Sequence, residues 1–244
     1  MRTYAIGDIH GHLDKLQALH ALIEDDRLAT GDRAAPVVHI GDLVDRGPDS
    51  RGVIDFLIAG QGRGADWVVL KGNHDRMFSG FMADPDHHDS RLRRDLWWLH
   101  ERLGGAETLA SYGVADAGAR LLHDVQAEAR MKVPASHLAY LAALPTHHLR
   151  GGCLFVHAGV RPGIDLHDQT EDDLLWIRTD FLDDTRDHGA LVVHGHTPVD
   201  HVTHYGNRLN LDTGAGYGKA MSAVVIEGTD VFRLTPKGRE RVKP

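Results

Sequence analysis

The sequence YAIGDIHG, residues 4–11, sets the first expectation for the fold. The apolar residues Tyr4 to Ile6 are typical of a buried strand, and Gly7 permits the tight turn that ends it. Residues two apart in an extended segment face the same side, so Asp8 and His10 can bind one ion together. The segment therefore predicts a strand that delivers a carboxylate and an imidazole to one edge of a sheet.

Four further apolar runs end in the same way. They read PVVHIGDLVDRG (36–47), WVVLKGNHD (67–75), CLFVHAG (153–159) and LVVHGHTP (191–198). Helical patterns at 13–23 and 50–59 separate the first three strands, which predicts a largely parallel sheet. Ligands of such sheets bind beyond the carboxyl ends of the strands. The polar residues that directly follow the five strands, called strand exits below, should therefore meet at one site.

Between about 76 and 150 the pattern becomes helical, with helices expected at 92–103, 106–112 and 137–143. The short apolar segments at 202–204, 208–211, 223–226 and 231–234 predict an antiparallel meander that closes the chain. No repeat or proline-rich linker divides the sequence. We therefore expect one α/β domain over residues 1–244, with a helical cap insertion at about 76–150.

The composition is that of a folded globular protein, and its charge argues against several partners. The 27 Lys+Arg and 35 Asp+Glu give a net charge of −8, so nucleic acid is not an expected partner. No apolar run approaches the ~18 residues that cross a bilayer, and no signal peptide is predicted, so we expect a cytoplasmic protein without a membrane segment. The sequence carries no indication of an oligomeric state.

Histidine is unusually frequent in this chain. The 19 histidines and 35 carboxylates supply the two side-chain types that bind divalent transition metals. A mixed set of Asp, Asn and His is too rich in nitrogen for a dedicated Ca²⁺ or Mg²⁺ site, and it lacks thiolates. It favours Mn²⁺, with Fe or Zn²⁺ as alternatives, and five converging exits offer enough ligands for two divalent metal ions.

The five blocks, in this order, resemble those of the calcineurin-like metallophosphoesterases, specifically the phosphoprotein phosphatase branch and its bacterial serine/threonine phosphatases. Residues 98–113, LWIR (175–178) and DTGA (212–215) extend the resemblance over nearly the whole chain. It implies the αββα sandwich of that superfamily, with mixed sheets flanked by helices and a helical cap insertion.

The resemblance also implies that six side chains bind two cations that share one aspartate. The first cation would be held by Asp8, His10 and Asp42, and the second by the shared Asp42 with Asn73, His157 and His196. A water bridging the two cations would become the hydroxide that attacks phosphorus in line, without a covalent intermediate.

Four further residues acquire catalytic roles through the resemblance. Arg46 and Arg178 would bind the phosphate through forked, charge-assisted hydrogen bonds. His74 would be the general acid that protonates the leaving oxygen, and Asp45 would orient the ring of His74 and favour its charged form.

Simpler interpretations stand beside these roles. Asp and Asn after Gly are common in turns, and either arginine could be a surface ion-pair partner. His194 could be mistaken for the ligand two residues later, but the pattern GHTP selects His196. The run DPDHHD (84–89) could hold a third metal, although its polarity and its proline favour a solvated loop.

The resemblance implies a metal-dependent phosphomonoesterase, and we expect a serine/threonine phosphoprotein phosphatase that acts on a phosphorylated protein or a small phosphoester. The alternative is a dinucleoside polyphosphate hydrolase of the diadenosine tetraphosphate type. Symmetrical hydrolases of that type typically have alanine at the position of Asp45 and depart from the GHTP of 195–198. The third hypothesis, a catalytically silent metal-binding protein, would need a missing ligand, and none is missing.

Overall fold

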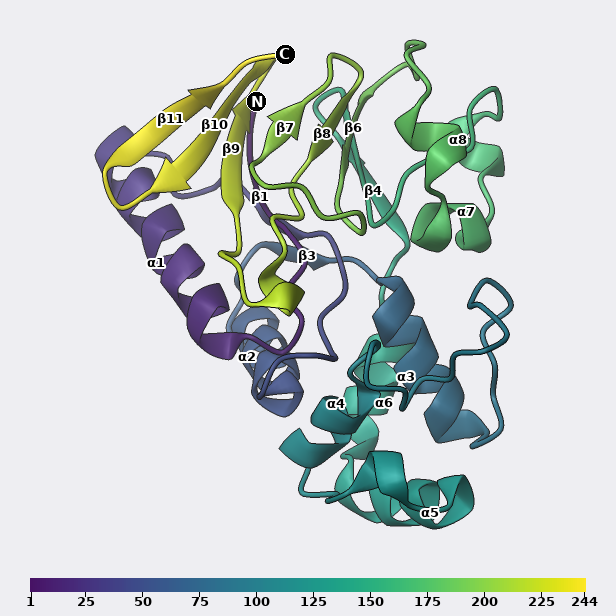
Figure 1. Ribbon diagram of the computed structural model, residues 1–244. Coiled ribbons are helices and arrows are strands. Elements are labelled where there is room, and N and C mark those ends of the chain that lie inside the picture. The colour runs from purple at the N-terminus through teal and green to yellow at the C-terminus, as the bar shows by residue number, and fades with distance from the viewer.

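The computed structural model describes residues 1–244 and contains two β-sheets with helices on their outer sides (Figure 1). The first sheet has the strand order β11-β10-β9-β1-β2-β3, and the second has the order β4-β5-β6-β8-β7. Apolar side chains from both sheets, among them Val38, Phe155, Val193 and Val224, form one buried cluster between them. This is the sandwich of mixed sheets flanked by helices that the resemblance implied.

The strands that precede the five polar exits form as expected. In the first sheet, β1 (Arg2–Ile6), β2 (Val37–His39) and β3 (Trp67–Val69) pair in parallel. In the second sheet, β5 (Cys153–Val156) and β6 (Leu191–His194) are also parallel. Strands that are covered on both faces are apolar throughout rather than alternating, which explains the character of these runs.

The C-terminal segments do not form one meander, so that prediction is wrong. β7 (Thr203–His204) and β8 (Arg208–Asn210) belong to the second sheet, where β8 is parallel to β6. β9 (Ala223–Glu227) and β10 (Asp230–Thr235) join the first sheet, with β9 antiparallel to β1. The chain changes sheets between β8 and β9 because both strands place apolar residues in the core between the sheets.

Two polar edge strands were not predicted. β4 (His147–Arg150) ends the second sheet, and β11 (Gly238–Val242) ends the first. Both consist of exposed and half-buried residues and contain few apolar ones. A strand that packs no continuous face against the core leaves only a weak pattern in the sequence.

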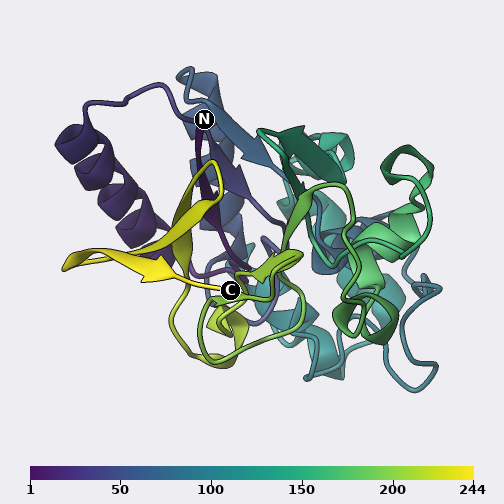
Figure 2. The same cartoon turned by 90° about the horizontal axis from the view of Figure 1, so that it is seen from above.

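The helices lie on the outer faces of the two sheets. α1 (Leu13–Thr30) and α2 (Ser50–Gly62) cover the first sheet, and α7 (Glu171–Trp176) and α8 (Thr179–Leu182) cover the second. Seen from above, α1 and the green segment that contains α7 and α8 lie on opposite sides of the molecule (Figure 2). None of the helices combines the length and apolar character that a membrane crossing requires.

Four helices come between β3 and β4 in the chain, and they lie together at one end of the sandwich (Figure 1). They are α3 (Asn73–Ala83), α4 (Gly105–Ser111), α5 (Leu122–Lys132) and α6 (Ala135–Ala143). The helix predicted at 92–103 is wrong: successive turns replace it, and they bury Trp98, Leu99 and Leu103. The division into one domain with an insertion at 76–150 stays a prediction, and α3 begins three residues earlier, at the strand exit itself.

Candidate metal centre

The exits of β1, β2, β3, β5 and β6 meet where the two sheets end. The six residues expected to bind metal are all buried there: Asp8, His10, Asp42, Asn73, His157 and His196. The first four come from the first sheet and the last two from the second. The site therefore spans both sheets, and Asp42 lies at its centre.

Asp42 contacts a histidine with each of its oxygens. Its Oδ2 lies 3.4 Å from Nε2 of His10, and its Oδ1 lies 3.3 Å from Nε2 of His157. On the far side of each ring, Nδ1 donates to a backbone carbonyl, Val44 for His10 and Ile40 for His157. In a neutral ring this bond leaves Nε2 as an acceptor, so two acceptors face the oxygens of Asp42, and the one on His10 also accepts from Arg46. A cation between them would remove the repulsion.

Asn73 and His196 complete the second half of the site. The Oδ1 of Asn73 lies 2.9 Å from both His157 Nε2 and His196 Nδ1. Nε2 of His196 is buried and has no hydrogen-bond partner. Asp42, His157 and His196 bring one donor atom each within 4.8 Å of one another, as three metal ligands require. An unpartnered buried nitrogen in such a group fits a metal ligand.

The first half of the site differs in detail from the expected grouping. His10 and Asp42 form a second potential ligand group with His74 rather than with Asp8. Asp8 accepts the backbone N–H of His196 at 3.1 Å, which joins the β1 exit to the β6 exit. The structure thus brings all six expected ligands together and places His74 beside them.

Backbone strain is concentrated at this site. Five of the six non-glycine residues with positive φ belong to it: His10, Asp42, Asp45, Arg46 and His196. Two glycines also have no room for a side chain, because a Cβ would lie 2.0 Å from Asp8 Oδ1 at Gly195 and 2.2 Å from Asp42 Oδ1 at Gly72. Strained conformations persist when the surroundings fix them, and they cluster at functional sites.

The electrostatics of the site also fit divalent cations. Burial lowers the pKa of His10, His157 and His196, so their rings are neutral and can act as ligands. Burial, followed by the charges of Asp212 and Asp42, raises the pKa of Asp8 well above its usual range. The pKa of Asp212 is raised to about 6, again chiefly by burial. Crowded carboxylates with raised pKa values are ionised more readily when a cation binds among them.

Asp45 and His74 form a tight buried pair. His74 Nδ1 donates to Asp45 Oδ2 at 2.6 Å, as expected for a histidine oriented by an aspartate. Two residues of the helical segment also hold Asp45: Trp98 Nε1 donates to Oδ2 at 2.9 Å, and Thr108 Oγ1 donates to Oδ1 at 2.7 Å. These two donors were not predicted, because Trp98 and Thr108 are 53 and 63 residues from Asp45 in the chain and no local sequence pattern links them to it.

The two arginines differ in their surroundings. Arg46 donates to Nε2 of His10 at 2.7 Å and to Nε2 of His74 at 3.1 Å, and its buried Nε has no partner. Arg178 is exposed between α7 and α8 and forms no ion pair, and its charge contributes to the lowered pKa of His196. Arg46 therefore bridges two histidines of the site, whereas the exposed Arg178 has no ion-pair partner.

The other candidate metal ligands considered from the sequence lie outside the candidate metal centre. His194 is buried at the end of β6, where it accepts from Arg208. In the run 84–89, Asp89 binds Arg76 with both oxygens, and no group of potential metal ligands forms there. Asp75, the last residue of the block 67–75, accepts the backbone N–H groups of Leu43 and Gly72 and so joins the β2 and β3 exits.

Comparison with known proteins agrees with this geometry. The profile described as calcineurin-like phosphoesterase matches residues 1–221. The chain belongs to this family. Its members' fold implies divalent metals, and the chain is accordingly a hydrolase with candidate metal-binding groups at the sheet ends.

Individual relatives carry more specific names. The asymmetrical bis(5'-nucleosyl)-tetraphosphatase PrpE of Anoxybacillus flavithermus is 25% identical over 98% of this chain and 97% of its own. A symmetrical bis(5'-nucleosyl)-tetraphosphatase of Coxiella burnetii is 44% identical, but over only 30% of this chain and 22% of its own. The crystal structure of a putative diadenosine tetraphosphatase has a TM-score of 0.64 with 22% identity, covering 96% of this chain and 92% of that one, and shows the shared fold.

The expectation of a serine/threonine phosphoprotein phosphatase is therefore wrong. Relatives that match this chain end to end are named bis(5'-nucleosyl)-tetraphosphatases. Asp45 and the GHTP of 195–198 distinguish the chain only from symmetrical hydrolases. They do not distinguish it from asymmetrical hydrolases, and the relatives that match the chain from end to end have that name.

Proposed function

We propose that this protein hydrolyses dinucleoside polyphosphates such as diadenosine tetraphosphate and that it cuts the phosphate chain off-centre. The observation that carries the proposal is the end-to-end match to asymmetrical tetraphosphatases, whereas symmetrical ones match less than a third of the chain. The geometry supports metal-dependent hydrolysis of a phosphoester, because two potential ligand groups share Asp42 and Arg46 contacts both histidines of one group.

In this proposal the six buried ligands hold two divalent cations. The combination of Asp, Asn and His ligands favours Mn²⁺ as the metal. Such cations neutralise phosphate oxygens and lower the pKa of a coordinated water when they are bound. Arg46 and Arg178 bind the phosphate that is attacked. A water oxygen bonds to phosphorus as the bond from phosphorus to the bridging oxygen breaks.

His74 would give the departing oxygen its proton from Nε2, once this nitrogen is protonated and no longer accepts from Arg46. Its Nε2 faces Arg46 and the ligand cluster, and its Nδ1 is fixed by Asp45. An anhydride oxygen leaves as a stable phosphate anion, so this proton matters less for a polyphosphate than for an alkyl phosphate. Replacing His74 by Asn should therefore slow the hydrolysis of an alkyl phosphate more than that of the dinucleotide.

Product analysis tests the proposal. With Mn²⁺ and diadenosine tetraphosphate, we expect equal amounts of ATP and AMP, which chromatography separates from ADP. Two molecules of ADP would contradict the off-centre cut, and no cleavage would contradict the proposed activity. The Asp42→Asn variant should lose about 100-fold in rate, whereas Asp25→Asn, at an exposed position of α1, serves as the matched control.

A further inference from the structure

A short helical turn, η3 (Ala215–Tyr217), covers one side of the metal centre and presents an exposed aromatic ring. Tyr217 is 61% exposed, so the core does not need it. The guanidinium carbon of Arg46 lies 4.6 Å from the centre of its ring. One face of the tyrosine is therefore occupied by the proposed phosphate-binding arginine, and most of the remaining ring surface is open to solvent.

The turn is held close to the site rather than projecting freely. A Cβ on Gly216 would lie 2.5 Å from Cδ2 of His10 and 2.9 Å from Cδ of Arg46. Ala215 is buried, and Lys15 donates to the backbone carbonyls of Ala215 and Lys219. Gly214 and Gly218 flank the turn in the left-handed conformation. These contacts fix Tyr217 directly beside the metal centre.

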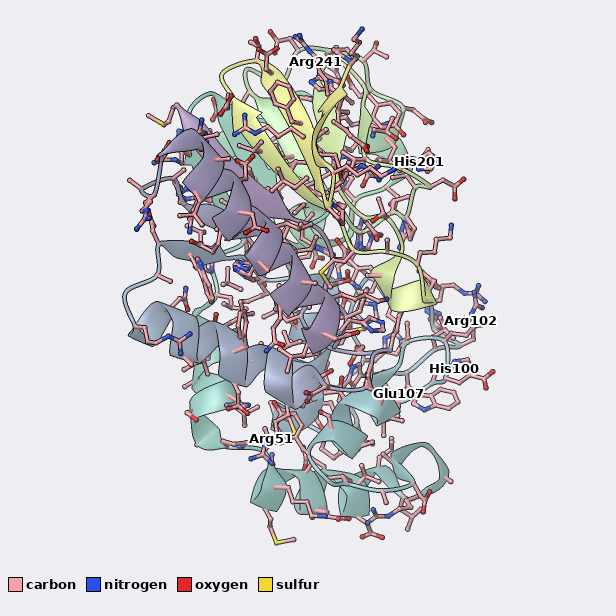
Figure 3. All side chains as sticks on the ribbon, turned by 90° about the vertical axis from the view of Figure 1, so that its left-hand side faces the viewer. Arg51, His100, Arg102, Glu107, His201 and Arg241 are labelled. Atoms are coloured by element: carbon pink, nitrogen blue, oxygen red, sulfur yellow. The ribbon has the colours of Figure 1, made fainter.

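The segment on the other side of Arg46 leaves the same space open. Gly104 lies against the backbone of Arg46, whose N–H donates to the carbonyl of Gly104. Figure 3 shows Arg102 of this segment on the same side of the molecule as the yellow-green turn η3. Arg102 is exposed and forms no ion pair.

Resting on the proposed function, we propose that Tyr217 is a nucleobase-binding residue: a base of the substrate stacks on its ring while the neighbouring phosphate is bound by Arg46. A ligand that satisfies both groups must carry a flat aromatic ring a short distance from a phosphate, as a nucleotide does. Stacking accepts any base, because every base has a π-face. It places a nucleoside next to the clamped phosphate, which agrees with a cut near one end of the phosphate chain.

The test compares ADP with pyrophosphate as inhibitors of p-nitrophenyl phosphate hydrolysis at saturating Mn²⁺. Both carry two phosphates, and only ADP has a base. In the native protein ADP should inhibit at a lower concentration than pyrophosphate. Tyr217→Ala should reduce the ratio of the two inhibition constants about tenfold, and Tyr217→Phe should keep it. Because the ratio is compared, any change at Arg46 that affects both inhibitors cancels.

Tyr205 provides the matched control. Arg208 stacks on its ring at 3.6 Å, and it is 47% exposed, but it precedes β8 at the end of the strand away from the metal centre. Tyr205→Ala should leave the ratio unchanged. An unchanged ratio in Tyr217→Ala, or an equal fall in Tyr205→Ala, would overturn the inference. A protein that shows the ratio effect but does not cleave diadenosine tetraphosphate would overturn the proposed function alone.

Discussion

Asp45 connects the helical segment to the proposed general acid, His74. It is fully buried and accepts hydrogen bonds from His74, Trp98 and Thr108. Two of these donors come from outside the strand exits. The segment that contains Trp98 and α4 therefore fixes the carboxylate that orients the proposed general acid.

The Trp98→Phe variant tests this role. It keeps an aromatic ring in the core but removes the donor to Asp45, so the orientation of His74 should become less defined. We expect hydrolysis of phenyl phosphate, whose leaving oxygen needs a proton, to slow about tenfold, and that of p-nitrophenyl phosphate to slow much less. Trp97→Phe, at the exposed neighbouring position, is the control. Equal losses on the two substrates would show that Trp98 has only a structural role.

The sequence predicted some residues of the centre better than others. Asp8, His10, Asp42, Asn73, His157 and His196 each follow a strand directly, and the rule that parallel strands end at one edge brings them together. Trp98, Thr108 and Tyr217 follow no such rule. Their positions depend on how the helical segment and η3 pack back over the site, which a local pattern does not encode.

At the scale of elements, the packing of α2 on β3 depends on one glycine. A Cβ on Gly60 would lie 1.8 Å from the ring of Trp67, which itself packs against His20 and Phe56. Alanine normally favours a helix over glycine, by up to ~1 kcal/mol. Here the intrinsic preference and the packing act in opposite directions.

We expect Gly60→Ala to lower the free energy of unfolding by about 1–3 kcal/mol, because overpacking outweighs helix propensity. Gly62→Ala in the same helix, where no atom lies within 4 Å of the new Cβ, should be neutral or stabilising. Urea unfolding of the two variants measures the difference. If both variants were equally stable, Trp67 would not restrict this contact.

Elements with a buried, apolar pattern were predicted well, and the others were not. The strands before the five exits and the start of α1 and α2 agree with the sequence analysis. β4 and β11 are polar edge strands, and the segment 92–103 buries apolar residues through successive turns. Its spacing resembles that of a helix, but the burial of Trp98, Leu99 and Leu103 is achieved without one.

At the scale of the whole molecule, a pair of buried histidines links stability to pH. His20 of α1 and His39 of β2 lie with their Nε2 atoms 3.0 Å apart, beside Trp67. Burial, and then the neighbouring His39, lowers the pKa of His20 to about 3, and burial lowers that of His39 to about 4. Below pH 6.5 the unfolded chain takes up protons that the folded protein does not, so stability falls as the pH falls.

Between pH 7 and pH 5 each of these histidines should reduce the free energy of unfolding by about 2 kcal/mol. His20→Phe removes one of the two contributions, so the variant should lose about 2 kcal/mol less than the native protein over this interval. Chemical unfolding at several pH values checks it. His123→Phe, at an exposed position, should follow the native protein, and a parallel profile for His20→Phe would refute the linkage.

The two sheets meet at one candidate metal centre, and the proposed substrate rests on the chain's end-to-end similarity to proteins named asymmetrical tetraphosphatases. The most direct test is the ratio of kcat/KM for diadenosine tetraphosphate to kcat/KM for a phosphoserine peptide, measured on one Mn²⁺-loaded sample. We predict a ratio well above one, about 100 or more, since Tyr217 would bind a base that only the dinucleotide has and an anhydride oxygen leaves more readily than the serine oxygen. A ratio below one would contradict the account.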